Sequence, residues 1–180
     1  MLPILIPEQE LFDSNTNEFY TIKERKIRLE HSLISISKWE SKWKRSFIDK
    51  PPAKQDEIFS YIKFMLLDND VSDDALKGLT QKNISDIFEY INDPMSATTV
   101  TNSKNGKTKK EILTSEVIYA YMAIYGIPFS CEKWHLNRLI KLIQVCADKN
   151  NPPEKMGKND IFKQNRSLNA ARRAAMHSKG

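Results

Sequence analysis

The hydrophobic period of this chain changes once, near residue 36, and that change constrains the fold more than any other feature. Before it, apolar side chains occupy every second position of Leu2–Ile6 and again through Lys26–Ser35. A period of two is typical of half-buried strands. Phe19–Lys23 is a further β-branched and aromatic run, and Asp13–Asn17 is rich in turn residues. We therefore expect a small antiparallel sheet of about three strands.

After residue 36 the apolar residues follow the period of a helix. Ser37 and Glu40 have the spacing of a capping box, which predicts the start of the first helix there. Apolar stripes then predict helices over 55–67 and 80–92. The Asp93-Pro94 pair is a strong stop signal after the last of these.

The densest apolar stripes belong to two further segments, Ser115–Tyr125 and Ser130–Ala147. Each begins with a serine that is able to cap a helix, and Trp134 lies on the second stripe. The intervening Gly126-Ile127-Pro128 forces the chain to turn. We expect these segments to form an antiparallel helix pair that is the centre of stability.

These patterns define the predicted fold class and domain organisation. We expect an α+β protein that is mostly helical. A small N-terminal antiparallel sheet over residues 1–36 would precede a helical body over 37–148 and a basic C-terminal arm over 149–180. Residues 95–110 interrupt the helical period, and we expect either a hairpin or a mobile surface loop there. Residues 150–153, with two prolines, are expected to be a linker.

The positive charge of the chain is confined to the arm. The sequence holds 28 Lys and Arg against 23 Asp and Glu, and 8 of the basic but only 2 of the acidic residues lie at or after Lys149. The rest of the chain is therefore close to neutral. Val117–Phe129, the longest apolar stretch, is too short to cross a bilayer, so we expect no membrane association. The 2 cysteines cannot form a disulfide framework, and we expect both to be reduced in a cytosol.

Motif chemistry gives no indication of an enzyme. Cys131 and His135 have a spacing that would suit a metal on one helix face, but no second ligand pair accompanies them. No glycine pattern of a phosphate-binding loop and no nucleophile motif is present in the sequence. We therefore predict no catalytic residues, no metal and no cofactor.

Two groups of residues are candidates for partner binding. Trp39, Trp43 and Phe47 recur at a spacing of four, which predicts an aromatic helix face that is core or, with one edge exposed, a partner surface. The arm supplies the second group, Lys163, Arg166, Arg172 and Arg173. These side chains would either contact nucleic-acid phosphates or belong to a segment that orders on a protein partner.

Several stretches of the sequence carry a family resemblance. They are residues 29–33 (LEHSL), 37–43 (SKWESKW), 92–98 (NDPMSAT), 127–139 (IPFSCEKWHLNRL), 152–156 (PPEKM) and 165–173 (NRSLNAARR). In this order they resemble a family of small proteins that tailed bacteriophages and prophages encode among their virion morphogenesis genes. We associate that family with tail assembly chaperones.

The resemblance implies a non-enzymatic assembly factor in the host cell cytoplasm. Such a chaperone binds the tape-measure protein during tail morphogenesis, and the tail tube protein displaces it. The alternative is a structural virion component, such as a minor tail, connector or capsid-associated protein, whose basic arm contacts neighbouring subunits or DNA. A homo-oligomer is a further partner hypothesis. The polar segment 101–110 departs from the family pattern, and the resemblance transfers no catalytic or ligand-binding residue.

Overall fold

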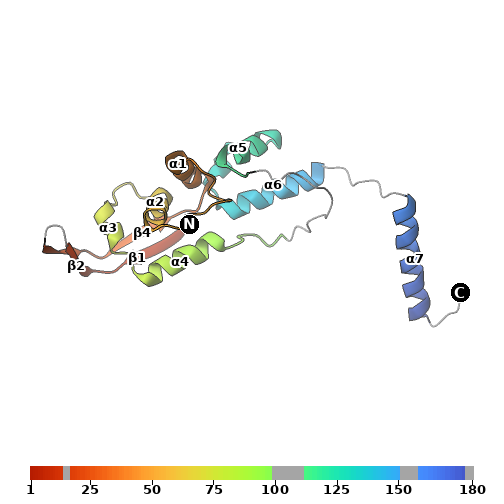
Figure 1. Cartoon of the computed structure of the whole chain (residues 1–180), viewed down its shortest axis with the longest axis horizontal. Coiled ribbons are helices and arrows are strands. Elements are labelled where there is room, and N and C mark those ends of the chain that lie inside the picture. The colour runs from red at the N-terminus through yellow and green to blue at the C-terminus, as the bar shows by residue number, and fades with distance from the viewer. Residues whose placement is uncertain (14–16, 99–111, 151–157, 177–180) are drawn as a thin grey trace. The chain divides into compact units, whose positions relative to one another are not determined.

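The computed structural model describes residues 1–13, 17–98, 112–150 and 158–176. It divides into two compact units, Met1–Ala147 and Asp148–Gly180, which we describe separately (Figure 1). The first unit contains the strands and seven of the helical segments that the structure describes, counting one short 3-10 helix, and the second contains the helix α7. The predicted fold class, α+β and mostly helical with a small N-terminal antiparallel sheet, is confirmed.

The N-terminal strands form one long antiparallel hairpin with an interruption in the middle. Strand β1 (Leu2–Ile6) pairs with β4 (Arg25–Leu29), and β2 (Gln9–Asp13) pairs with β3 (Glu18–Ile22). The same register continues across the interruption, where Pro7 has no N–H group to donate to the ladder. The sequence pattern missed β2, because its apolar residues are adjacent rather than alternating.

The β1–β4 half of the hairpin is anchored to the helices on one face. Ile4, Ile6, Ile27 and Leu29 are buried there, as their alternation predicts. Helix α4 packs against β1, and the chain that follows α2 pairs with the open edge of β4, with Leu67 N donating to the carbonyl of Arg28 at 3.0 Å. The sheet is therefore part of the same core as the helices.

Strand β4 ends at Leu29, whereas the sequence predicts a strand over 26–35. The first helix starts earlier than the sequence predicts. Helix α1 spans Leu33–Trp43, and Ser32 is its cap. Ser35 N donates to Ser32 Oγ at 3.3 Å and Ser32 N donates to Ser35 Oγ at 3.0 Å, which is a reciprocal capping box. The predicted box of Ser37 and Glu40 is therefore wrong.

Helix α1 also ends earlier than expected, so the three aromatic residues do not share one helix. Lys44 adopts a left-handed conformation with φ 54°, which terminates α1 directly after Trp43. Phe47 lies in the following turn and packs edge-on against Trp39, with ring centroids 5.3 Å apart. The spacing of four was thus correct for contact between the rings but not for a continuous helix.

The remaining helices of this unit agree with the sequence in part. Helices α2 (Gln55–Met65) and α4 (Gln81–Asn92) confirm two predicted segments, and the short α3 (Asp73–Lys77) between them was not predicted. Helix α5 spans Ser115–Ile124 and is capped by Thr114. Gly126 adopts φ 65°, consistent with the predicted turn after α5.

The predicted single helix over Ser130–Ala147 is wrong in its first part. A 3-10 segment, η1 (Phe129–Lys133), comes first, and α6 starts only at Leu136 and continues to Asn150. The backbone between them is extended because His135 forms an isolated bridge with Ser32. Helix α5 packs mainly against α1, which also contacts α2 and η1, so α5 and α6 are not the predicted principal pair.

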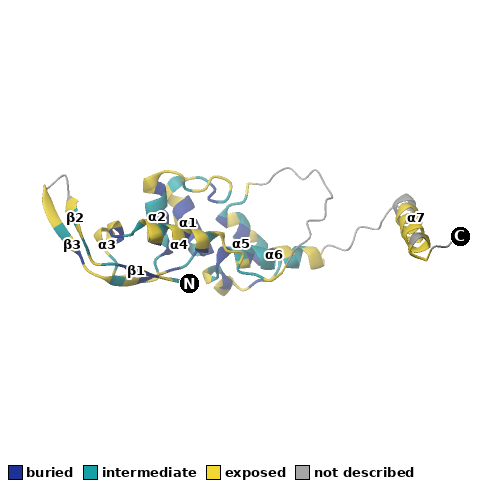
Figure 2. Cartoon of the chain, turned by 90° about the horizontal axis from the view of Figure 1, so that it is seen from below, coloured by how far each residue is buried: buried dark blue, intermediate teal, exposed yellow. Residues whose placement is uncertain are grey.

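The second unit is described as one helix, α7 (Lys158–Ala175). Its described side chains are exposed (Figure 2). Asn150, expected to begin a linker, is instead the last residue of α6. Residues 151–153 of that linker and most of the predicted hairpin or loop over 95–110 lie outside the described residues. Within the described part of the chain, no helix has the length and apolar character needed to span a membrane.

Candidate functional site

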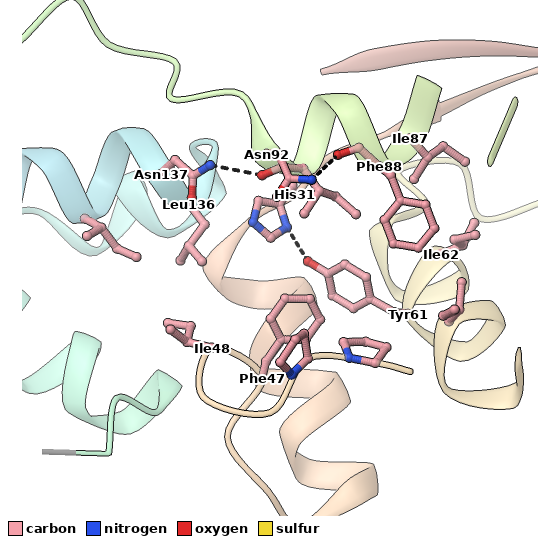
Figure 3. A pocket seen from close by; sticks show the side chains of 15 residues that line it. His31, Phe47, Ile48, Tyr61, Ile62, Ile87, Phe88, Asn92, Leu136 and Asn137 are labelled. Carbon is pink, nitrogen blue, oxygen red and sulfur yellow. Dashed lines mark hydrogen bonds between the residues drawn. The ribbon is translucent and has the colours of Figure 1, made fainter. Parts of the chain in front are cut away.

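An apolar groove opens between three helices and a loop of the first unit (Figure 3). Its volume is about 480 Å³. Helices α2, α4 and α6 and the segment 47–52 supply its walls, and aliphatic and aromatic side chains dominate them: Phe47, Ile48, Pro51, Pro52, Ile58, Ile62, Ile87, Phe88, Ile91, Leu136 and Ile140. Phe88 is 39% exposed, so an aromatic ring at the groove is available to solvent.

Two buried polar residues, His31 and Tyr61, form the polar part of the lining. His31 Nδ1 and the Tyr61 hydroxyl are hydrogen-bonded to each other, and Figure 3 shows this pair within the groove. Burial, and to a smaller extent the nearby His135, lower the pKa of His31 to about 3. Burial also raises the pKa of Tyr61. Both groups are therefore neutral near pH 7.

His135 connects this polar pair to helices α4 and α6. Its ring lies 5.0 Å from that of His31, and its Nε2 donates to the carbonyl of Tyr90 at 2.9 Å. Its Nδ1 accepts the N–H of Asn137 at 3.3 Å, which defines the tautomer. Leu136 N donates to the carbonyl of His31 at 2.7 Å. The start of α6 is thus fixed beside the chain that leads into α1.

The amide side chains at the groove are occupied by the fold itself. Asn137 Nδ2 donates to the carbonyls of Ile91 at 3.0 Å and Asp93 at 2.7 Å, which joins the end of α4 to the start of α6. Asn92 Nδ2 donates to the carbonyl of Phe88 at 2.8 Å. The groove therefore offers a partner mainly apolar surface rather than directed hydrogen bonds.

The side chains that line the groove suit the binding of apolar groups. Cys131 lies on η1 and His135 lies between η1 and α6, so the two do not share a helix face as their spacing suggested. In the part of the chain that the structure describes, no group of three His, Cys, Asp or Glu residues is placed to hold a metal ion. Apolar side chains that bind in the groove are removed from water.

The structure places the predicted aromatic face largely inside the core. Trp39 is fully buried, and its Nε1 donates to the carbonyl of Glu57 at 3.1 Å. Phe47 is 6% exposed and contributes to one wall of the groove. Trp43 is half-buried, with Nε1 donating to Ser60 Oγ at 2.9 Å. Of the two alternatives for Trp39, Trp43 and Phe47, the structure agrees with core for the first and last, because little of either side chain reaches solvent.

The arginine of an ion pair lies over the ring of Trp39. The Arg45 guanidinium lies over the indole, 5.0 Å from the ring centroid, and donates to Glu57 Oε2 at 2.7 Å. The same carboxylate accepts the backbone N–H groups of Ala53 and Lys54 at the start of α2. These backbone hydrogen bonds, and then Arg45, hold the pKa of Glu57 below its usual value.

The predicted basic residues belong to the other unit. Lys163, Arg166, Arg172 and Arg173 are all exposed on α7. The two groups of predicted residues therefore belong to different units of the structure.

The groove has only a weak signal in the sequence. The stripes that contain Ile58, Ile62, Ile87 and Ile91 were expected to be core, and these residues are buried or half-buried as core residues are. Phe88, directly beside Ile87, widens the apolar face of α4 beyond a single stripe, and this was the available signal.

Comparisons with protein-family models, with curated proteins and with solved structures found no match for the chain.

Proposed function

We propose that this protein is a non-enzymatic assembly factor that holds an apolar helix face of a partner in the groove between α2, α4 and α6. The observation that carries the proposal is the groove itself, with its aliphatic and aromatic walls and its solvent-accessible Phe88. An amphipathic helix that docks in an apolar groove is a common mode of protein recognition. The neutral state of His31 and Tyr61 keeps the groove free of charge, which favours an apolar occupant.

The sequence resemblance supports a specific partner. If the chain is a tail assembly chaperone, the occupant is a helical segment of the phage tape-measure protein, and the tail tube protein releases it. Before the tail tube polymerises around it, a long helical protein exposes apolar surface to solvent. Such a protein would aggregate unless another protein bound that surface. A groove that covers apolar side chains without directed hydrogen bonds fits a partner that has to be released later.

The proposal is tested by changing one exposed ring of the groove. Phe88→Ala removes the accessible aromatic side chain, and Phe129→Ala is the matched control, since Phe129 is 55% exposed on η1 and does not line the groove. We expect Phe88→Ala to weaken binding of the tape-measure protein of the same phage or prophage by about tenfold or more, as loss of an interface anchor does. Calorimetric titration of purified proteins gives the two affinities. Equal affinities, or no complex with the wild-type chain, would contradict the proposal.

The alternative, a permanent virion component, is favoured by one observation, the exposed cationic helix α7. Quantitative mass spectrometry of purified virions separates the two functions. An assembly factor is nearly absent from finished particles, whereas a structural component is present at a fixed copy number.

A further inference from the structure

Helix α7 presents a concentrated positive charge to solvent. From Phe162 to Met176 the sequence holds Lys163, Arg166, Arg172 and Arg173 and no acidic residue. All four side chains are exposed, so none is buried in the core of its own unit. The chain before Lys149 is close to neutral, and the arm therefore carries almost all of the electrostatic attraction that the protein has for a polyanion.

The cations also lie on one side of the helix. At about 100° per residue, the positions of Lys163, Arg166, Arg172 and Arg173 fall within one half of the helix circumference. Leu168 and the alanines at 171 and 175 occupy the other half. Helix α7 has 18 residues, which corresponds to a length of about 27 Å. The result is a cationic surface that runs along the helix.

We propose that α7 is a nucleic-acid-binding element that contacts the phosphate backbone without reading base sequence. Three of the four exposed cations are arginines, whose planar guanidinium groups match phosphate oxygens in two-point hydrogen bonds. Phosphates repeat along a nucleic-acid strand, so a cationic face that extends along a helix meets several of them at once.

The same face differs from what an acidic protein partner would require. Protein interfaces usually place aromatic or aliphatic anchors at their centre, with charges at the rim. On α7 the half that carries the cations has a single large apolar side chain, Phe162, which is 73% exposed. An exposed aromatic ring among cations is also suited to stacking on a nucleic-acid base. These observations favour a polynucleotide over a protein.

The test measures binding of the full-length chain to a fluorescently labelled duplex DNA of about 30 base pairs by anisotropy. Four phosphate contacts predict a slope of about −3.6 for the logarithm of affinity against the logarithm of salt concentration. Affinity should therefore fall on the order of 100-fold between 50 and 200 mM salt. Two duplexes of unrelated sequence should bind equally, because no base is read.

Two double variants locate the contact. Arg172→Gln/Arg173→Gln removes two cations from α7 and should reduce the salt slope by about 2. Lys50→Gln/Lys82→Gln removes the same charge from exposed positions of the first unit and should leave the slope unchanged. Circular dichroism should show gained helix on DNA binding, since an isolated helix of this length is marginal in water. Thermal unfolding of both variants should match the wild type, which shows that the first unit is intact.

Other outcomes would overturn the proposal. No binding at 50 mM salt, or equal loss of slope in both double variants, removes α7 as the binding element. If polyglutamate displaces the DNA at equal charge concentration, the face recognises acidic protein. If vesicles that contain phosphatidylserine increase the helix content of α7 and DNA does not, the ligand is a lipid surface.

Discussion

Buried polar residues hold the parts of the first unit in place, and His31 and His135 are the most consequential of them. The two imidazoles lie edge to face with ring centroids 5.0 Å apart, and each hydrogen-bonds as a neutral ring. Protonating either would bring a charge into a buried site beside another histidine, which burial opposes. These side chains therefore make the stability of the fold depend on pH.

Stability should fall as the pH drops below about 6.5. The unfolded chain then binds protons on its histidines, whereas burial keeps His31 unprotonated until about pH 3. The folded pKa is lower than the unfolded one, so the loss begins at the unfolded pKa and continues towards the folded value. His31 alone should cost about 2 kcal/mol between pH 7.5 and pH 5. Urea denaturation at the two pH values measures this loss.

The control for this prediction is His31→Gln, which removes one titrating group and keeps a polar side chain. The variant should be less stable than the wild type at pH 7.5 but should lose less stability on acidification. The pKa of His135 is also lowered by burial, so part of the pH dependence should persist in the variant. An unchanged difference between the two pH values would show that His31 is not the titrating group.

Glu40 is a second buried polar residue with a structural role. Its Oε1 accepts the N–H of Phe47 at 2.8 Å and its Oε2 accepts the N–H of Ser115 at 2.7 Å, which joins the turn after α1 to the start of α5. Glu40→Ala leaves two backbone donors without their acceptor, so the free energy of unfolding should fall by roughly 2–4 kcal/mol. Glu40→Gln keeps one acceptor oxygen and should lose less in the same urea experiment. Equal losses would contradict this order and show that the one acceptor oxygen and the packing kept in Glu40→Gln stabilise nothing.

At the scale of elements, the sequence predicted the helices that have a clear apolar periodicity. It missed the helix boundaries that depend on contacts with residues far along the chain. Helices α2 and α4 were found because their apolar stripes and local signals agree. The start of α1 was missed because Ser32 and Ser35 cap it without a glutamate, while Glu40 bonds to residues far along the chain. The break between η1 and α6 was missed because it depends on the pairing of His135 with Ser32, which no local pattern encodes.

Helix α1 should be the centre of stability, in place of the pair expected from sequence. It contacts α2, α5 and η1, and its Trp39 is fully buried. Trp39→Ala should therefore cost roughly 3–5 kcal/mol, as large truncations in cores do. Trp134 is only half-buried, beneath the guanidinium of Arg138 at 4.3 Å from the ring centroid, so Trp134→Ala should cost clearly less. Chemical denaturation measures the free energy of unfolding of both variants. A larger loss for Trp134→Ala than for Trp39→Ala would show that the 115–147 region is the centre of stability.

For the whole molecule, charge and packing divide the chain at about the same place. The buried hydrophobic residues of the described chain all lie between Ile4 and Ile143, inside the first unit. The excess positive charge lies after Lys149. Charge asymmetry along the sequence therefore indicated the arm, whereas the groove depends on the relative placement of three helices and was not predictable from their separate stripes.

Truncation after Asn150 should separate the two proposed binding activities. Because the described core is complete before that residue, the shortened chain should unfold cooperatively, with a melting temperature within a few degrees of the full-length protein. It should retain affinity for the tape-measure partner, which the groove accounts for, and lose affinity for duplex DNA, which α7 accounts for. Calorimetric unfolding and the two binding titrations on one preparation measure all three properties. A truncated chain that fails to fold would show that the arm belongs to the core, and one that folds but loses the helical partner would place that binding site on α7.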